Sequence, residues 1–283
     1  MEVTKLAYAL GAEIAGIDLR RPVDAAAIAH IRSAWLEHHV LVFRDQDITP
    51  QQHVAFSRCF GELERHANRY NRHPDYPELF LVTNRTIDGK PSDTRNVGRQ
   101  WHSDGAYSLR PPTGSLLHSQ ELPGVGGDTL FANMNLAYQS LSPKLRQLLD
   151  GLWAVNDRAA VKNNANIDPQ RMAERLKVNP PVAHPVVRVH PETGRKSLYV
   201  SETVTTQFVG MKPEESRPLL EFLFAHSVRA EFVYRHRWRV HDLVMWDNRC
   251  TMHLAPPDYD TSKPRHMQRT TLLGAESGHL YTG

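Results

Sequence analysis

Apolar and polar positions along this chain follow patterns that predict both strands and helices. Alternating or short continuous apolar runs, which are typical of strands, occupy residues 39–43, 79–84, 113–120, 128–131, 231–239, 242–247 and 269–273. Residues 11–24 alternate in the same way and predict a short strand pair. Residues 186–200 predict a hairpin, with its turn at 190–194.

Helical spacing of apolar residues predicts helices over residues 25–38, 141–152 and 212–226. Another helix has start and stop signals: Thr49 suits the N-cap, Pro50 the first helical position, and Gly61 lies past the end. Because strands dominate the centre and end while helices flank them, the order favours a mainly β sheet sandwich or jelly roll.

Two polar segments interrupt this pattern. Residues 87–100 are rich in Gly, Ser, Asn and Asp and predict a loop that leads into Trp101. Residues 161–181 are polar and Asn-rich, and we interpret them as a lid insertion that is partly helical at 169–176. The length of 283 residues suits one large domain or two small ones, and we expect a single domain over residues 1–283.

Composition and charge exclude some classes of protein. Hydrophobic residues make up 40% of the chain, and no apolar run approaches membrane-spanning length. The net charge of +3 comes without a long basic block, so nucleic-acid binding is not indicated. With no secretion signal recognised in the first ten residues and only Cys59 and Cys250, we expect a cytoplasmic protein.

Histidine is unusually frequent, with 16 residues, which raises the prospect of a metal site. Two side chains two positions apart on a strand point to the same face, so His102 and Asp104 could supply two ligands of a 2-His-1-carboxylate iron site. The pattern alone is weak, because about one such match is expected by chance. The similar sequences at 73–75 and 190–192 contain proline in turn-like surroundings, which suits a rigid ligand pair poorly.

A cluster near the end of the chain strengthens the case for His102 and Asp104. Residues 245–249 (MWDNR) close a strand, and His253 follows after a short turn. Arg265 and Arg269 come next, and their forked guanidinium groups suit a carboxylate cosubstrate.

Taken together, these segments resemble the taurine dioxygenase family, which includes phenoxyacetate-herbicide and alkylsulfate dioxygenases. The matching segments are GAEIAGIDLRRP, ITPQQH, FGEL, WHSD, ELPGVGGDTLF, HPVVRVHPETGRKSLYV, WDNRCTMH and RHMQRTTLLG. The resemblance implies a double-stranded β-helix (jelly-roll) fold. It also implies an Fe(II)- and 2-oxoglutarate-dependent dioxygenase that uses O2, releases succinate and CO2, and can break a carbon–heteroatom bond after hydroxylation.

The resemblance also implies roles for individual residues. His102, Asp104 and His253 would hold the iron, while Thr129 and Arg265 would contact the distal carboxylate of 2-oxoglutarate. Without the resemblance, Thr129 would pass for an ordinary strand threonine and Arg265 for a surface charge.

A second group of residues is implied on the substrate side. Arg269 would lie beside the cosubstrate and the acid group of the substrate, and His66 would touch the substrate anion. His66 could instead cap helix carbonyls. Arg158 and Val204 stand where aromatic residues line the taurine pocket, and Arg69 stands near His66 where the family has a tyrosine, so taurine itself is in doubt.

These departures shape the expected partners. We expect a small anionic substrate (a sulfonate, an alkyl sulfate, or an aryloxy or alkyl carboxylate), including Arg158 among its contacts, with the segment 161–181 limiting its size. We expect no nucleic-acid or membrane partner, and a homo-oligomer, either a dimer or a tetramer.

Two other functions use the same residues. A zinc hydrolase could use the same three ligands, but it leaves Arg265 and Thr129 without a role and lacks a clear general base. A catalytically silent jelly-roll binding protein would have no need for an intact set of ligands.

Overall fold

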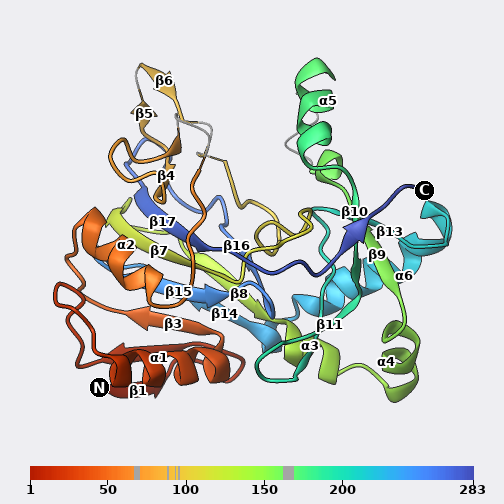
Figure 1. The fold of residues 1–283 in the computed structure, drawn as a ribbon, viewed down its shortest axis with the longest axis horizontal. Helices are drawn as coiled ribbons and strands as arrows, with labels where there is room; N and C mark the ends of the chain where they lie inside the picture. The colour runs from red at the N-terminus through yellow and green to blue at the C-terminus, as the bar shows by residue number, and fades with distance from the viewer. Residues whose placement is uncertain (67–70, 88, 93, 95, 162–168) are drawn as a thin grey trace.

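A seven-stranded sheet forms the centre of the protein in this computed structural model, which describes residues 1–66, 71–87, 89–92, 94, 96–161 and 169–283 (Figure 1). In spatial order its strands are β1 (Glu2–Lys5), β2 (Ala12–Ala15), β3 (Val40–Phe43), β15 (Leu243–Asp247), β7 (Gly114–Glu121), β17 (His266–Leu272) and β4 (Phe80–Thr83). Its neighbouring strands are antiparallel, except that β2 and β3 are parallel.

A smaller sheet faces one side of the large one. Its strands are β14 (Val233–His236), β8 (Thr129–Asn133) and β16 (Thr251–Leu254). Val244 and Trp246 of β15 enter the apolar cluster between the two sheets, where they meet Phe131 of β8. Because side chains alternate along a strand, Leu243 and Met245 point to the opposite face of the large sheet.

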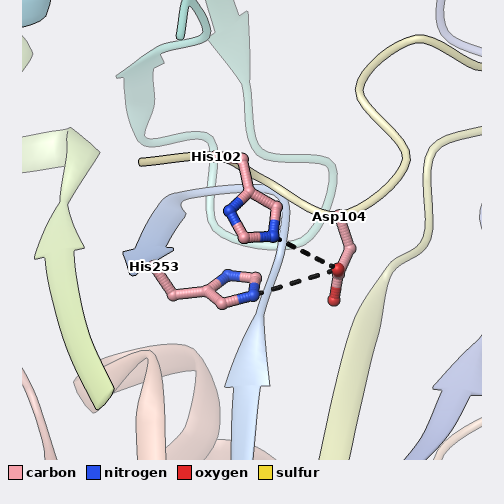
Figure 2. Close-up of side chains that lie close together, drawn as sticks. All are labelled: His102, Asp104 and His253. Carbon is pink, nitrogen blue, oxygen red and sulfur yellow. Dashed lines mark ion pairs between the residues drawn. The ribbon is translucent and has the colours of Figure 1, made fainter. Parts of the chain in front are cut away.

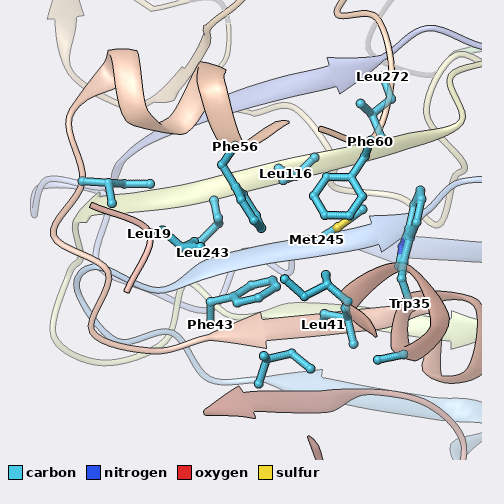
Figure 3. Close-up of a cluster of buried hydrophobic side chains, with 14 of the residues drawn as sticks. Leu19, Trp35, Leu41, Phe43, Phe56, Phe60, Leu116, Leu243, Met245 and Leu272 are labelled. Carbon is cyan, nitrogen blue, oxygen red and sulfur yellow. The ribbon is translucent and has the colours of Figure 1, made fainter. Parts of the chain in front are cut away.

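Helices α1 (Ala25–His38) and α2 (Pro50–Arg58) cover that opposite face (Figure 3). Trp35 of α1 and Phe56 of α2 meet Phe43 and Met245 there, and burying each such side chain is worth about 1.5–3 kcal/mol. The predicted start of α2 is confirmed, since Thr49 and Gln52 form a reciprocal capping box.

The remaining elements cover the outer face of the small sheet. They include α3 (Met134–Gln139), α4 (Pro143–Leu149), α6 (Pro213–Ser227), η4 (Ala230–Phe232), the hairpin β11 (Val187–Val189) and β12 (Lys196–Leu198), and a sheet of β13 (Thr205–Phe208), β9 (Trp153–Asn156), β10 (Val182–Pro185) and β18 (His279–Leu280). Ala132 and Met252 of the small sheet pack into this second core with Phe208 and Leu220. In the part of the chain that the structure describes, no helix is long and apolar enough to cross a membrane.

Several predicted elements differ from the structure. The strand pair expected within residues 11–24 is wrong, because β2 pairs with β1 and not with a strand inside that segment. Residues 87–100, expected to be a loop, begin inside a short hairpin of β5 (Thr86–Ile87) and β6 (Lys90–Pro91). Strands of two to four residues such as these carry too little periodicity to identify from the sequence.

The proposed lid lies partly within the described residues. Helix α5 (Pro169–Val178) confirms the helical part, and the 3-10 helix η2 (Arg158–Ala160) precedes the segment (Figure 1). Residues 162–168 of the predicted insertion lie outside the described residues. Its role as a lid therefore stays a prediction.

Because several histidines are buried in the core, we expect the folding stability of the protein to fall in acid. Burial lowers the pKa of His39 and His118 to about 4 and that of His53 to about 3. Below the ordinary histidine value near 6.5, the unfolded chain takes up protons that the folded protein cannot. Stability should therefore fall as the pH drops from about 6.5 to 4, by roughly 1 kcal/mol per pH unit for each histidine.

Urea unfolding of the metal-free protein across this pH range measures the effect. The free energy of unfolding should decline steadily below pH about 6.5, and the variant His53→Gln should show a shallower slope than the parent protein. A free energy that stays constant from pH 6.5 to 4 would show that these histidines are not held neutral.

Candidate metal centre and adjoining pocket

His102, Asp104 and His253 come together at one place in the fold (Figure 2). The Oδ1 atom of Asp104 lies 3.9 Å from Nε2 of His102 and 3.9 Å from Nε2 of His253. The two imidazole rings are 4.2 Å apart at their centroids, and one ligand atom from each residue lies within 4.8 Å of the others. Two imidazoles and one carboxylate are the donors of a facial iron site with open positions.

The position of His253 follows from its strand. His253 lies on β16 opposite Phe131 of β8, and its ring is 5.0 Å from the ring of Trp246, so it points into the space between the two sheets. His102 is held beside it by a single β-bridge, in which each residue donates its backbone N–H to the other's carbonyl, at 3.1 and 2.8 Å. The expectation that His102 and Asp104 share a regular strand is wrong, because pairing ends at this bridge and Asp104 lies in a turn.

Both the histidines and the carboxylate are in states that suit metal binding. Nδ1 of His102 donates to the carbonyl of Gln100 at 2.8 Å, which leaves the Nε2 lone pair available for a metal. Burial, followed by the nearby His102, lowers the pKa of His253 to about 3, so this ring is neutral. Burial alone would raise the pKa of Asp104, but Arg269 and the two histidines hold it below its ordinary value. The residues present therefore fit a divalent metal.

Two further side chains orient the carboxylate. Ser115 of β7 donates its hydroxyl to Oδ2 of Asp104 at 2.8 Å, and Arg269 of β17 donates from Nη1 to Oδ1 at 3.0 Å. The sequence offered no signal for Ser115 beyond its place on a strand. Arg269 was expected beside the cosubstrate and substrate, and the structure places it directly on Asp104.

A pocket is lined by His102 and His253 of the candidate metal centre and by the buried Arg265. Nε of Arg265 donates to the carbonyl of Gly127 at 3.1 Å. Thr129 also lines the pocket, and its Oγ accepts a hydrogen bond from Nε1 of Trp238 at 3.0 Å, so the threonine hydroxyl can still donate to a ligand. Burial lowers the pKa of Arg265 to about 10, which leaves it charged at neutral pH. A buried cation beside a hydroxyl donor suits a ligand carboxylate.

Other residues of this pocket were missed in the sequence analysis. Asn84, Arg99 and Tyr259 line it, and the guanidinium carbon of Arg99 lies 5.5 Å from the centre of the Tyr259 ring. Arg99 and Tyr259 come from segments without a regular pattern, and Asn84 ends a predicted strand, but local patterns do not show which distant segments meet.

His66 and Arg269 both lie beside Phe80. The ring of His66 is 5.0 Å from the ring of Phe80, and the guanidinium carbon of Arg269 is 5.3 Å from the same ring. Burial, followed by the charge of Arg269, lowers the pKa of His66 to about 4, so it is neutral at neutral pH. Its Nδ1 lies 3.7 Å from Oε1 of Glu64, and its buried Nε2 has no hydrogen-bond partner among the described residues. The helix-capping alternative therefore finds no support.

Three further residues, Arg158, Val204 and Arg69, were considered on the substrate side. The guanidinium carbon of Arg158 lies 4.5 Å from the centre of the ring of Tyr107. Val204 is buried against Ala106, two residues after Asp104 in the chain. Arg69 lies outside the described residues.

The two other sequences that match the His-x-Asp or His-x-Glu pattern, residues 73–75 and 190–192, do not form metal sites in the described part of the chain. Nδ1 of His73 accepts from the backbone N–H of Asp75 at 3.2 Å, within a surface turn. His190 donates to Asp247, whose carboxylate also accepts two hydrogen bonds from the guanidinium of Arg249, at 2.8 and 2.6 Å. Although Cys250 lies close to this pair, the carboxylate is already occupied, so the group is an internal ion-pair network.

Comparisons with known proteins show the family to which the chain belongs. The family model described as "Taurine catabolism dioxygenase TauD, TfdA family" matches residues 2–271. An alpha-ketoglutarate-dependent 2,4-dichlorophenoxyacetate dioxygenase from Cupriavidus pinatubonensis is 38% identical over 280 residues, covering 94% of each chain. An alpha-ketoglutarate-dependent sulfate ester dioxygenase from Pseudomonas putida is 35% identical over 287 residues, covering 97% of this chain and 90% of that protein.

Solved structures are similar over the whole chain. The crystal structure of AAD-2 in complex with Mn(II) and N-oxalylglycine has a TM-score of 0.85 and 34% identity, covering 98% of this chain and 99% of that one. A taurine dioxygenase from Burkholderia xenovorans has a TM-score of 0.84 and 36% identity, covering 100% and 95%. A related fold therefore binds a divalent metal together with a small dicarboxylate.

Proposed function

Because the chain belongs to the TauD, TfdA family of dioxygenases, we propose that it uses Fe(II), 2-oxoglutarate and O2 to hydroxylate a small anionic organic substrate. Succinate and CO2 are the co-products. Alpha-ketoglutarate, named in the relatives, is the same compound as 2-oxoglutarate. The proposal includes a double-stranded β-helix for the two facing sheets within a single domain, which the likeness to solved family members supports.

One observation carries the proposal: the three candidate ligand atoms lie within 4.8 Å of one another, and the pocket lined by His102 and His253 is also lined by the buried Arg265. His102, Asp104 and His253 would hold the iron. Once it is bound with its cosubstrate, this metal supplies the oxidising chemistry that hydroxylates a substrate carbon. The zinc hydrolase alternative gives no reason for a buried arginine in the same pocket as the two histidines.

The cosubstrate end of the pocket is built by the chain itself. We assign the distal carboxylate of 2-oxoglutarate to Arg265 and to the hydroxyl of Thr129, because both donors are buried and face the same pocket. Leu117 and Trp246 form apolar parts of the pocket wall. Such walls exclude water and strengthen the charge-assisted bonds at Arg265.

The substrate class rests on His66, Arg269 and the relatives. Both residues flank Phe80 beside Asp104, and His66 Nε2 lies unbonded among the described residues. Relatives are named for acting on phenoxy acids and sulfate esters, which are small and anionic. We therefore infer a sulfonate, an alkyl sulfate, or an aryloxy or alkyl carboxylate, with Arg158 as an additional substrate contact.

A panel of such anions tests the function. Purified protein with Fe(II), ascorbate and 2-oxoglutarate should release succinate in a substrate-dependent manner with at least one of them. Neutral and cationic analogues serve as controls, and Zn(II) in place of Fe(II) should give no activity. Preference for a neutral or cationic compound would contradict the anionic class, whereas activity with Zn(II) alone would contradict the dioxygenase mechanism.

The variant His66→Ala should separate substrate binding from cosubstrate use. We expect the KM for the anionic substrate to rise by roughly tenfold, which corresponds to the loss of one hydrogen bond to a charged group. The apparent affinity for 2-oxoglutarate should not change, since His66 does not line the cosubstrate pocket of the described structure. Steady-state kinetics with both compounds varied provides the measurement.

A matched control is His30→Ala, which removes an exposed histidine from α1. That variant should behave like the parent enzyme. An unchanged substrate KM in His66→Ala would exclude His66 from the substrate site. The homo-oligomer and the cytoplasmic location stay predictions.

A further inference from the structure

The segment between His253 and Arg265 is fastened to the glycine turn that precedes Thr129. Oδ1 of Asp258 accepts the backbone N–H of Gly127 at 2.9 Å. The backbone of Asp258 also lies against Gly126, where a Cβ atom would come within 2.1 Å of the Asp258 carbonyl oxygen. Gly126 has a φ of +73°, so both the conformation and the close approach require glycine here.

The same turn holds Arg265. The carbonyl of Gly127 accepts the hydrogen bond from Nε of Arg265 at 3.1 Å. Gly127 is therefore held through its N–H by Asp258 and holds Arg265 through its carbonyl. Thr129 lies two residues further on, at the start of β8. The turn thus connects Asp258 to both proposed cosubstrate contacts.

Arg235 of β14 contacts both the turn and the segment that carries Asp258. Its Nε donates to Oδ2 of Asp128 at 2.7 Å, and its Nη2 pairs with Oδ2 of Asp258. The guanidinium therefore joins the turn to the segment that carries Asp258. Arg235 is 48% exposed, so its ion pairs are screened by solvent, and the partly buried hydrogen bond from the N–H of Gly127 to Asp258 matters more.

We propose that Asp258 is a positioning residue for 2-oxoglutarate, acting through Gly127 to fix Arg265 and Thr129. The inference rests on the proposed function, because it takes Arg265 as the cosubstrate cation. Asp258 does not line the described pocket, although Tyr259 beside it does. It therefore acts through other residues. A fork of donors binds a carboxylate well only when it is already in place, so a loosened turn weakens cosubstrate binding and leaves the metal ligands untouched.

Two variants of Asp258 and one matched control test this. Asp258→Ala removes both the acceptor for Gly127 and the charge facing Arg235. Asp258→Asn keeps an oxygen that can accept from Gly127 but loses the charge. Asp260→Asn is the control, because Asp260 lies in the same segment and the hydrogen bonds described for its carboxylate come from Ser262, at 2.9 and 2.7 Å.

Binding of N-oxalylglycine to the Mn(II)-loaded protein, measured by calorimetry, gives the main result. Asp258→Ala should weaken binding by roughly tenfold, and Asp258→Asn by less, whereas Asp260→Asn should bind like the parent protein. Mn(II) affinity and the thermal unfolding midpoint should stay unchanged. In steady-state assays the KM for 2-oxoglutarate should rise while kcat at saturating 2-oxoglutarate holds.

Several outcomes would overturn the inference. One is unchanged N-oxalylglycine affinity in Asp258→Ala. The others are an equal loss of this affinity in Asp260→Asn, or a loss in Asp258→Ala that is accompanied by weaker Mn(II) binding. The variant Arg265→Ala separates this inference from the proposed function. If Arg265→Ala binds N-oxalylglycine normally, the proposed cosubstrate site is wrong. If Arg265→Ala loses binding while Asp258→Ala keeps it, only the role of Asp258 fails.

Discussion

Alanine at His102, Asp104 or His253 is expected to abolish turnover and to weaken iron binding by more than about a hundredfold. In the proposed site each of these residues supplies one of three protein ligands, and the two histidines each place Nε2 at 3.9 Å from the same carboxylate oxygen. Loss of any one leaves a site with two ligands, which can neither hold the metal firmly nor fix its open positions. Substrate-dependent succinate release and an Fe(II) titration measure the two effects separately.

His73 and Asp75, which match the same His-x-Asp pattern outside the proposed site, provide the control for this prediction. His73→Ala and Asp75→Ala should retain full activity, since His73 accepts only a local backbone hydrogen bond in a surface turn. For Asp104 an additional variant, Asp104→Asn, tests the charge while preserving the shape of the side chain. It should also fail, because the amide removes the negative charge that both the metal and Arg269 require. Near-normal activity in Asp104→Ala would disprove the proposed ligand set.

The second large effect is expected for Arg265→Ala, which should raise the 2-oxoglutarate requirement by well over tenfold. Charge-assisted bonds to a carboxylate are worth roughly 1.5–3 kcal/mol, and the buried position of Arg265 strengthens them. Thr129→Ala should act in the same direction but less, because it removes a single neutral donor. The apparent affinity for 2-oxoglutarate at saturating substrate is the measurement.

Arg20→Ala is a suitable control for Arg265→Ala. Arg20 is 62% exposed and pairs with Asp18 on the surface, so its removal should leave the 2-oxoglutarate affinity unchanged. If Arg265→Ala retained the affinity of the parent enzyme, another cation would have to hold the cosubstrate. Arg99, which lines the same pocket, would be the residue to examine next.

Local signals in the sequence were sufficient for much of the scaffold. Helix α1 spans the residues predicted from apolar spacing, and α2 begins where its N-cap Thr49 predicts, because both signals involve residues only a few positions apart. The hairpin of β11 and β12 and the core strand β15 were also predicted from periodicity. The sequence analysis missed β9, β10 and β16, which are four-residue strands stabilised by partners distant in the chain.

The proposed site also has features that the sequence indicated and features that only the fold revealed. Residue types and spacing pointed to His102, Asp104 and His253 as ligands of a metal and to Arg265 as a partner for a carboxylate. The role of Thr129 came only from the family resemblance. The sequence could not show that only one β-bridge holds His102 beside His253. Such a contact depends on the path of the chain and not on local preference.

Charge at the site was decided by the tertiary structure alone. From the sequence, His66 and Arg269 counted as two cationic or donating groups ready for a substrate anion. In the fold, burial keeps His66 neutral, and Arg269 already donates to Asp104, 165 positions away in the sequence. Asp258 is a further example, since its contact with Gly127 spans 131 positions. The sequence determined which groups are present, whereas burial and long-range contacts decided their protonation and their partners, because both depend on neighbours that only folding brings close.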